Sequence, residues 1–135
     1  MLTLELAQRL IDAAQAEARE QGHRLSFAVV DGGGHLVALA RMDDADWITP
    51  EVAIGKAWTA AAYRLPSATQ GDKAKDLVAF AGAISAATHG RYTPQIGGLP
   101  VVIDGAPAGG MGASGAAGHE DEAVVRAALE RVLGA

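Results

Sequence analysis

Cysteine is absent from this sequence of 135 residues. Its absence excludes disulfides, thiolate zinc sites, iron–sulfur clusters and covalent attachment of c-type haem. A chain of this length buries enough surface to fold without such cross-links. We therefore expect one domain over residues 1–135.

Basic residues are outnumbered: the chain has 11 Lys and Arg and 16 Asp and Glu, which gives a net charge of −5. No basic cluster occurs, so we expect binding to neither nucleic acid nor an anionic membrane surface. The chain has no apolar run long enough to span a bilayer, and Glu5 precedes any basic residue. We therefore expect no signal peptide, and the cytoplasm as the location.

Aromatic residues make up only 4% of the chain, although 50% of it is hydrophobic. Alanine supplies much of the non-aromatic hydrophobic share, and the chain also has 17 glycines. Such a core has few large side chains and many close backbone approaches. Flat, Ala-rich helices pack well against sheets and against one another, which favours a homo-oligomer.

Four helices are predicted, over residues 4–21, 49–64, from Ser67 to Gly90, and over 120–133. Thr49 is predicted to cap the second helix, with Pro50 as its first residue. Ser67 and Gln70 have the spacing of a capping box for the third helix.

Four strands are predicted, over residues 25–30, 35–41, 99–104 and 108–113. Glycine-rich or Asp-Gly turns join them into two hairpins. The order is α-β-β-α-α-β-β-α. It predicts an α+β fold in which an antiparallel sheet of two hairpins is flanked by helices.

Four short sequence motifs occur within this order of helices and strands. They are Ala-Val-Val-Asp-Gly-Gly-Gly-His-Leu-Val (28–37), Ala-Ile-Gly-Lys-Ala-Trp-Thr-Ala (53–60), Gly-Gly-Leu-Pro-Val-Val-Ile-Asp-Gly (97–105), and Gly-Gly-Met-Gly-Ala-Ser-Gly (109–115) followed by Asp121-Glu122. Together they resemble the GlcG/HbpS family, which includes the C-terminal domain of PduO-type proteins. The resemblance implies a profilin-like fold and a dimer or higher homo-oligomer. It also implies a ligand, haem or a corrinoid in some members, and a role accessory to a catabolic pathway.

Gly110-x-Gly112-x-x-Gly115 has the spacing of a dinucleotide-binding fingerprint. A Rossmann site also needs a second parallel strand ending in an acidic residue, and only one helix follows here. The glycines therefore let a strand pack closely against a helix. Alternatively, backbone N–H groups of residues 112–120 hold a carboxylate or propionate ahead of the last helix.

Lys56, Thr59 and Tyr63 share one face of the second helix, because they are three and seven residues apart. This polar face is either solvated or turned into a pocket. The resemblance, which includes a lysine in this helix, favours the pocket.

His35, His89 and His119 are candidate ligands of haem iron, each with an ordinary surface histidine as the alternative. The string His119-Glu120-x-Glu122 lacks the second histidine of a zinc-binding motif. We therefore predict no bound metal ion apart from haem iron.

Our first hypothesis is a binding module for a small-molecule or tetrapyrrole ligand, held between the helix of Lys56 and the segment 97–118. The predicted ligand-binding residues are Lys56, Thr59, Gly97, Gly98, Gly112, Ser114 and Gly115. The second hypothesis is a small cofactor-free isomerase, lyase or hydrolase for a carboxylated metabolite, with Lys56, Tyr63 and Glu122 as acid–base candidates. A buried Lys56 with a depressed pKa would favour the enzyme hypothesis, and a solvated Lys56 would remove the main support for it. A third hypothesis is a structural partner of another pathway protein, which an exposed apolar patch would favour.

Overall fold

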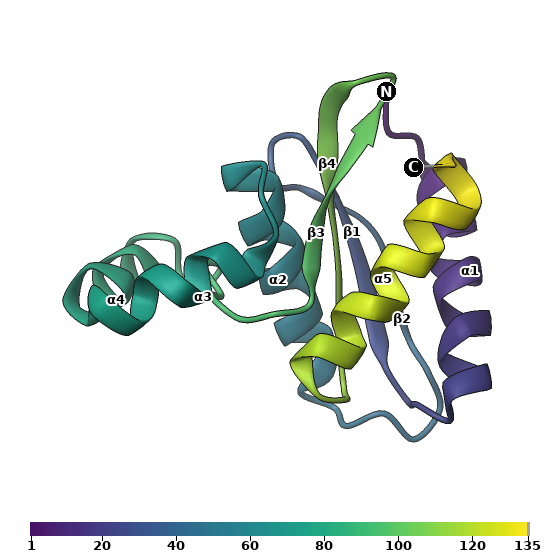
Figure 1. The fold of residues 1–135 in the computed structure, drawn as a ribbon, viewed down its shortest axis with the longest axis horizontal. Coiled ribbons are helices and arrows are strands. Elements are labelled where there is room, and N and C mark those ends of the chain that lie inside the picture. Colours follow the sequence, from purple (N-terminus) through teal and green to yellow (C-terminus); the bar gives the residue numbers. More distant parts are fainter. Residues whose placement is uncertain (135) are drawn as a thin grey trace.

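One antiparallel sheet lies between two layers of helices in the computed structural model, which describes residues 1–134 (Figure 1). The strand order is β2-β1-β4-β3. Helices α1 and α5 cover one face, and α2 covers the other. The bounds are α1 Leu4–Gln21, β1 Ser26–Asp31, β2 Leu36–Arg41, α2 Thr49–Tyr63, α3 Ser67–Asp76, α4 Val78–Ala87, β3 Gly98–Ile103, β4 Ala106–Ser114 and α5 Gly118–Leu133.

Strand β1 is buried on both faces. Phe27 and Val29 point into the larger core, against α1 and α5. Ala28 and Val30 point to the other side, where they pack against α2. The two faces alternate because successive side chains of a strand point in opposite directions.

Helix α2 approaches the sheet closely, because β4 presents glycines to it. A methyl group at Gly110 would overlap the carbonyl oxygen of Ala57, and one at Gly112 would overlap that of Ala53. The absence of side chains at these positions sets the height of α2 above the sheet. This height places Lys56 beside the end of β4.

The predicted fold class is confirmed, and so are the two hairpins. The segment predicted as one helix from Ser67 to Gly90 is divided at Leu77, whose φ of −124° and ψ of 56° interrupt the helical backbone.

Two predicted helix caps are wrong. Thr49 lies inside α2, and Ile48 is the cap residue. The Thr49 hydroxyl donates to the carbonyl of Asp46 at 2.7 Å. Ser67 and Gln70 form no capping box, because the Ser67 hydroxyl donates to the Gln95 carbonyl and the Gln70 amide accepts from Tyr92 at 3.1 Å. For Ser67 and Gln70 a tertiary partner replaces the local one, whereas the Thr49 hydroxyl bonds to a residue three positions before it.

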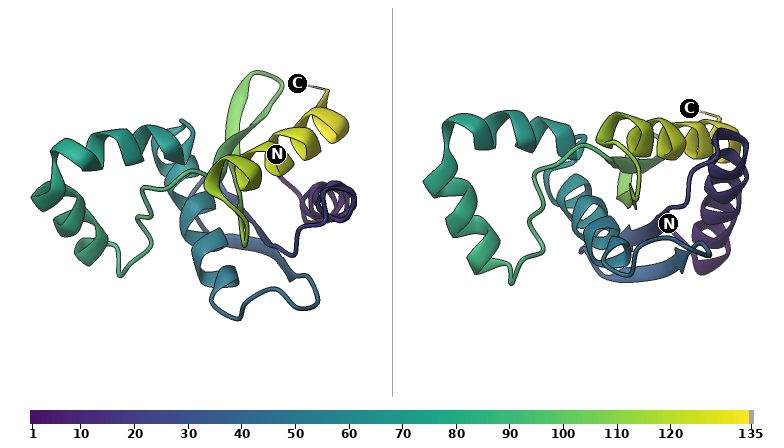
Figure 2. Two further views of the ribbon diagram at one scale, coloured as in Figure 1. Left: turned by 60° about the horizontal axis from the view of Figure 1, so that its bottom comes forward. Right: turned by 90° about the horizontal axis from the view of Figure 1, so that it is seen from below.

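Residues 67–90, here named the arm, extend away from the sheet (Figures 1 and 2). Among the described helices and strands, α4 contacts only α3. The arm is therefore a projection rather than a layer of the core. Within residues 1–134, every helix falls short of the length and apolar character needed to cross a membrane.

Candidate functional site

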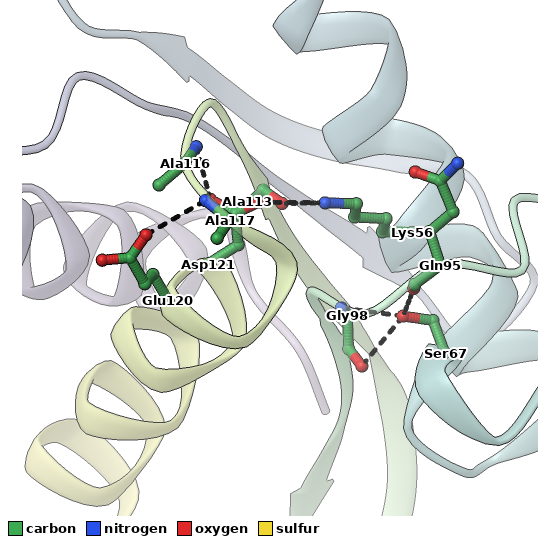
Figure 3. Close-up of polar contacts among 9 residues, drawn as sticks. All are labelled: Lys56, Ser67, Gln95, Gly98, Ala113, Ala116, Ala117, Glu120 and Asp121. Atoms are coloured by element: carbon green, nitrogen blue, oxygen red, sulfur yellow. Dashed lines mark hydrogen bonds and ion pairs between the residues drawn. The ribbon is translucent and has the colours of Figure 1, made fainter. Parts of the chain in front are cut away.

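A buried ion pair joins the middle of α2 to the first turn of α5. The Lys56 side chain reaches toward the end of β4 (Figure 3), and its Nζ donates to Asp121 Oδ2 at 3.1 Å and to the Ala113 carbonyl at 3.0 Å. Lys56 is 3% exposed and Asp121 is 1% exposed. Charges this deeply buried are normally paired, and these two satisfy each other.

The turn between β4 and α5 holds Asp121 in place. Asp121 Oδ1 accepts a hydrogen bond from the Ala116 amide at 3.0 Å, and Glu120 accepts one from the Ala117 amide at 3.2 Å (Figure 3). The free amides at the start of α5 thus gain acceptors, and both carboxylates suit the positive end of the helix dipole.

Burial raises the pKa of the Asp121 carboxyl above its usual range, while the ammonium of Lys56 and the Ala116 amide act in the opposite direction. Desolvation has the larger influence, because a buried carboxylate loses its hydration. Asp121 therefore loses its proton at a higher pH than an exposed aspartate does.

The ion pair borders a pocket of about 410 Å³. Such a volume suits a small organic ligand. Two amines and a hydroxyl face it, from Lys56, Lys75 and Ser114. Its lining comes from α2, α3, the loop before β3, and the junction of β4 with α5: Lys56, Ala68, Gly71, Asp72, Lys75, Pro94, Gln95, Ile96, Ser114, Ala116, Gly118 and Asp121.

Of the predicted ligand-binding residues, Lys56 and Ser114 line this pocket. The predicted glycines serve close packing. A Cβ on Gly97 would lie 2.7 Å from Lys56 Nζ, and one on Gly98 would overlap the Lys56 carbonyl. Gly112 lies against α2, and Gly115, with a φ of +137°, lies against residues 24 and 25.

Thr59 and Tyr63, predicted to share a face with Lys56, lie outside the pocket lining. The Thr59 hydroxyl donates to the Gly55 carbonyl and accepts from the Thr93 amide, both at 2.8 Å. The Tyr63 ring meets Tyr92 edge-on at 5.9 Å between centroids. Both residues connect α2 to the base of the arm.

Glu122, the predicted acid–base partner, pairs with Arg126 at 2.9 Å on the surface of α5. Asp121 stands beside Lys56 instead. The sequence placed Asp121 in the first turn of α5 but gave it no partner, because the two residues are 65 positions apart and meet only through packing.

The three candidate haem ligands come from three different parts of the chain and lie outside the pocket lining. His35 is exposed after the first hairpin turn and lies 3.3 Å from Asp31. His89 follows α4, and His119 is the second residue of α5; both are exposed. The lining residues themselves include no His, Tyr, Met or Cys. They therefore suit the acidic groups of a haem and not its iron.

Comparison with known proteins places the chain among relatives that share this whole fold. The family model "Haem degrading protein HbpS-like" matches residues 2–130. Protein GlcG of Escherichia coli K12 is 38% identical over 114 residues, which are 84% of this chain and 81% of GlcG.

Two solved structures are similar over nearly the whole chain. A double mutant of HbpS from Streptomyces reticuli has 31% identity and a TM-score of 0.84, covering 96% of this chain and 86% of HbpS. A PduOC:haem complex has 27% identity and a TM-score of 0.85, covering 95% and 92%. The chain therefore belongs to the HbpS-like family, as its four sequence motifs predicted.

Proposed function

We propose that this protein is a small-ligand-binding protein that holds a carboxylate-bearing ligand in the pocket beside Lys56. The observation that supports this most directly is the buried Lys56–Asp121 pair on the pocket wall. A buried ion pair is a poor source of stability, because desolvation of both charges offsets their attraction. Its position at a pocket is better explained by a role in binding.

The Lys56 ammonium has one N–H left for a ligand. An ammonium group has three donors, and those of Lys56 to Asp121 and Ala113 account for two. Lys75 offers a second cation, 3.7 Å from the exposed carboxylate of Asp72. A carboxylate between the two amines would gain charge-assisted hydrogen bonds.

Haem is the first ligand to test, because a relative with 27% identity is a haem complex and the family model is that of HbpS-like proteins. Haem propionates match the two amines. The lining residues supply no axial ligand for the iron, and His35, His89 and His119 are exposed outside the lining, so the pocket would hold hemin through its propionates.

Titration with hemin, followed by absorbance, tests this function. We expect a saturable, shifted Soret band, and a few-fold weaker affinity for hemin in Lys75→Met, since a solvent-exposed charge contact is worth up to about 1 kcal/mol. Lys73→Met is the matched control, because Lys73 is an exposed lysine of α3 outside the pocket lining. Absence of saturable binding for hemin and for small di- and tricarboxylates alike would contradict the proposal.

A second candidate function is acid–base catalysis on a carboxylated metabolite. It is favoured by the raised pKa of the buried Asp121 beside Lys56, since perturbed titratable pairs in pockets often transfer protons. In this version Asp121 takes the role first given to Glu122. Incubation of carboxylated metabolites in D₂O, with deuterium incorporation followed by mass spectrometry, tests it. Exchange that is lost in Asp121→Asn and kept in Glu122→Gln is the expected result.

A further inference from the structure

The amine of Lys56 is buried and yet lines the pocket. Its two protein acceptors, Asp121 Oδ2 and the Ala113 carbonyl, take two of the three donor positions of Nζ (Figure 3). Gly97 has no side chain to cover this atom, since a Cβ there would lie 2.7 Å from Nζ. A desolvated amine that is held in place and keeps one free position is suited to act as a nucleophile.

A proton acceptor for this amine is in contact with it. A lysine attacks a carbon atom only as the neutral amine, so its ammonium must first lose a proton. Asp121 Oδ2 lies 3.1 Å from Nζ and can take that proton directly. Burial raises the pKa of the Asp121 carboxyl, which makes it a better acceptor than an exposed aspartate.

Ser114 adds a hydroxyl group to the same pocket wall. Its side chain lines the pocket, and the residue is only 8% exposed. Its cross-strand neighbour Ser26 bonds to Thr49 at 2.8 Å instead, and no hydrogen bond within residues 1–134 engages the Ser114 hydroxyl. Buried hydroxyl groups normally have partners, so this one is available to an oxygen atom of a ligand.

We propose that Lys56 forms an imine with the carbonyl group of an oxo acid, whose carboxylate is attracted by Lys75. This step rests on the proposed function, because it uses the same pocket and the same attraction for carboxylates. It narrows the ligand class to molecules that carry both a ketone or aldehyde and a carboxylate. Hemin has no ketone or aldehyde, so its titration does not report on the imine.

The reaction balances without an added oxidant or reductant. The Lys56 ammonium passes a proton to Asp121, and the nitrogen lone pair attacks the carbonyl carbon while the C=O π electrons move to oxygen. A proton then moves from nitrogen to that oxygen, which gives a carbinolamine. Asp121 returns its proton to the new hydroxyl, the C–O bond breaks, water leaves and the C=N bond forms. The product is an iminium cation beside the Asp121 carboxylate, so the buried charge pair is restored.

Borohydride trapping with pyruvate and with 2-oxoglutarate tests the proposal. Reduction of the imine leaves a stable secondary amine, whose added mass is that of the acid less one oxygen atom. The other lysines are Lys73 and Lys75, so peptide mapping by mass spectrometry assigns the adduct. We expect a yield on Lys56 several-fold above that on Lys73, an exposed lysine outside the lining. In urea-unfolded protein the two yields should be equal.

Lys56→Arg is the matched variant, because it keeps a cation beside Asp121 but forms no imine that borohydride can trap. It should lose the adduct at this position with unchanged far-UV circular dichroism. Should the variant not fold, the peptide map of the wild type still decides. Acetone, a ketone without a carboxylate, should be trapped several-fold less than pyruvate, and Lys75→Met should lower the yield with pyruvate a few-fold.

Lactate separates the imine from the proposed function, because it has the carboxylate of pyruvate and no carbonyl group. We expect lactate to bind in calorimetry and to lower the yield of the pyruvate adduct on Lys56. Binding of lactate and pyruvate without a selective adduct on Lys56 would overturn the imine and leave carboxylate binding intact. Equal yields on Lys56 and Lys73 in the folded protein would also overturn the imine. Saturable binding of neither hemin nor any carboxylate would overturn both.

Discussion

At the scale of single residues, the Lys56–Asp121 pair is the feature most sensitive to change. Each charge has lost its hydration and depends on the other. We expect Lys56→Met to lower the free energy of unfolding by about 3–5 kcal/mol, because Asp121 then remains buried without its partner.

The double substitution Lys56→Met with Asp121→Leu is expected to recover most of that loss, since both desolvated charges are removed. Arg126→Met, which breaks the partly exposed pair with Glu122, should cost less than about 1 kcal/mol. Urea denaturation of the four proteins measures these differences. A double variant as unstable as Lys56→Met would show that the pair itself stabilises the fold.

The same pair gives the protein a pH dependence whose sign follows from the raised pKa of Asp121. The folded state holds the proton more tightly than the unfolded state. The contribution of Asp121 to stability is therefore greatest below 3.8, its ordinary value, and is lost as pH rises through the higher pKa of the folded state.

We expect the free energy of unfolding of the wild type, minus that of Asp121→Asn, to fall as the pH is raised from about 4 to about 8. The asparagine variant does not titrate at this position and so gives the baseline. Denaturation curves at a series of pH values measure the difference. A difference that grows with pH would mean that Lys56 outweighs desolvation.

At the scale of elements, the arm depends on the hydrogen bond between Tyr92 and Gln70. Both side chains are buried, and the Tyr92 hydroxyl is the partner of Gln70 Oε1. We expect Tyr92→Phe to cost about 1–3 kcal/mol, because the Gln70 amide oxygen is left unsatisfied.

Tyr63→Phe is the matched control, since Tyr63 packs against the same ring and is 36% exposed. It should leave stability nearly unchanged. Thermal unfolding and hydrogen exchange over residues 67–90 measure both effects. Equal losses in the two variants would show that the hydroxyl of Tyr92 does not hold the arm.

At the scale of the whole molecule, the homo-oligomer that the resemblance implies would make stability depend on protein concentration. A folded dimer in equilibrium with unfolded monomers gains stability by mass action. We expect the Tm of the protein to rise between micromolar and hundred-micromolar concentration, because dissociation into unfolded monomers is less favourable at higher concentration. Differential scanning calorimetry at several concentrations measures this. A Tm that stays constant over this range would contradict the expected homo-oligomer.

The sequence alone predicted the sheet, its hairpins and the family, because these follow from short-range patterns. Hydrophobic periodicity, Gly-rich turns and short motifs each involve only a few neighbouring residues, so they can be recognised in the sequence. Lys56 also stood out, as an amine in an otherwise apolar, Ala-rich helix.

Only the tertiary structure decided which residues meet. It gave Lys56 the partner Asp121 rather than Glu122 and interrupted the third predicted helix at Leu77. It also turned Thr59 toward the Thr93 amide, and the predicted capping residue Ser67 toward the start of β3. Such pairings depend on how far α2 stands from β4 and where α5 begins. Distances between elements arise from packing the whole chain at once, and no local pattern encodes them.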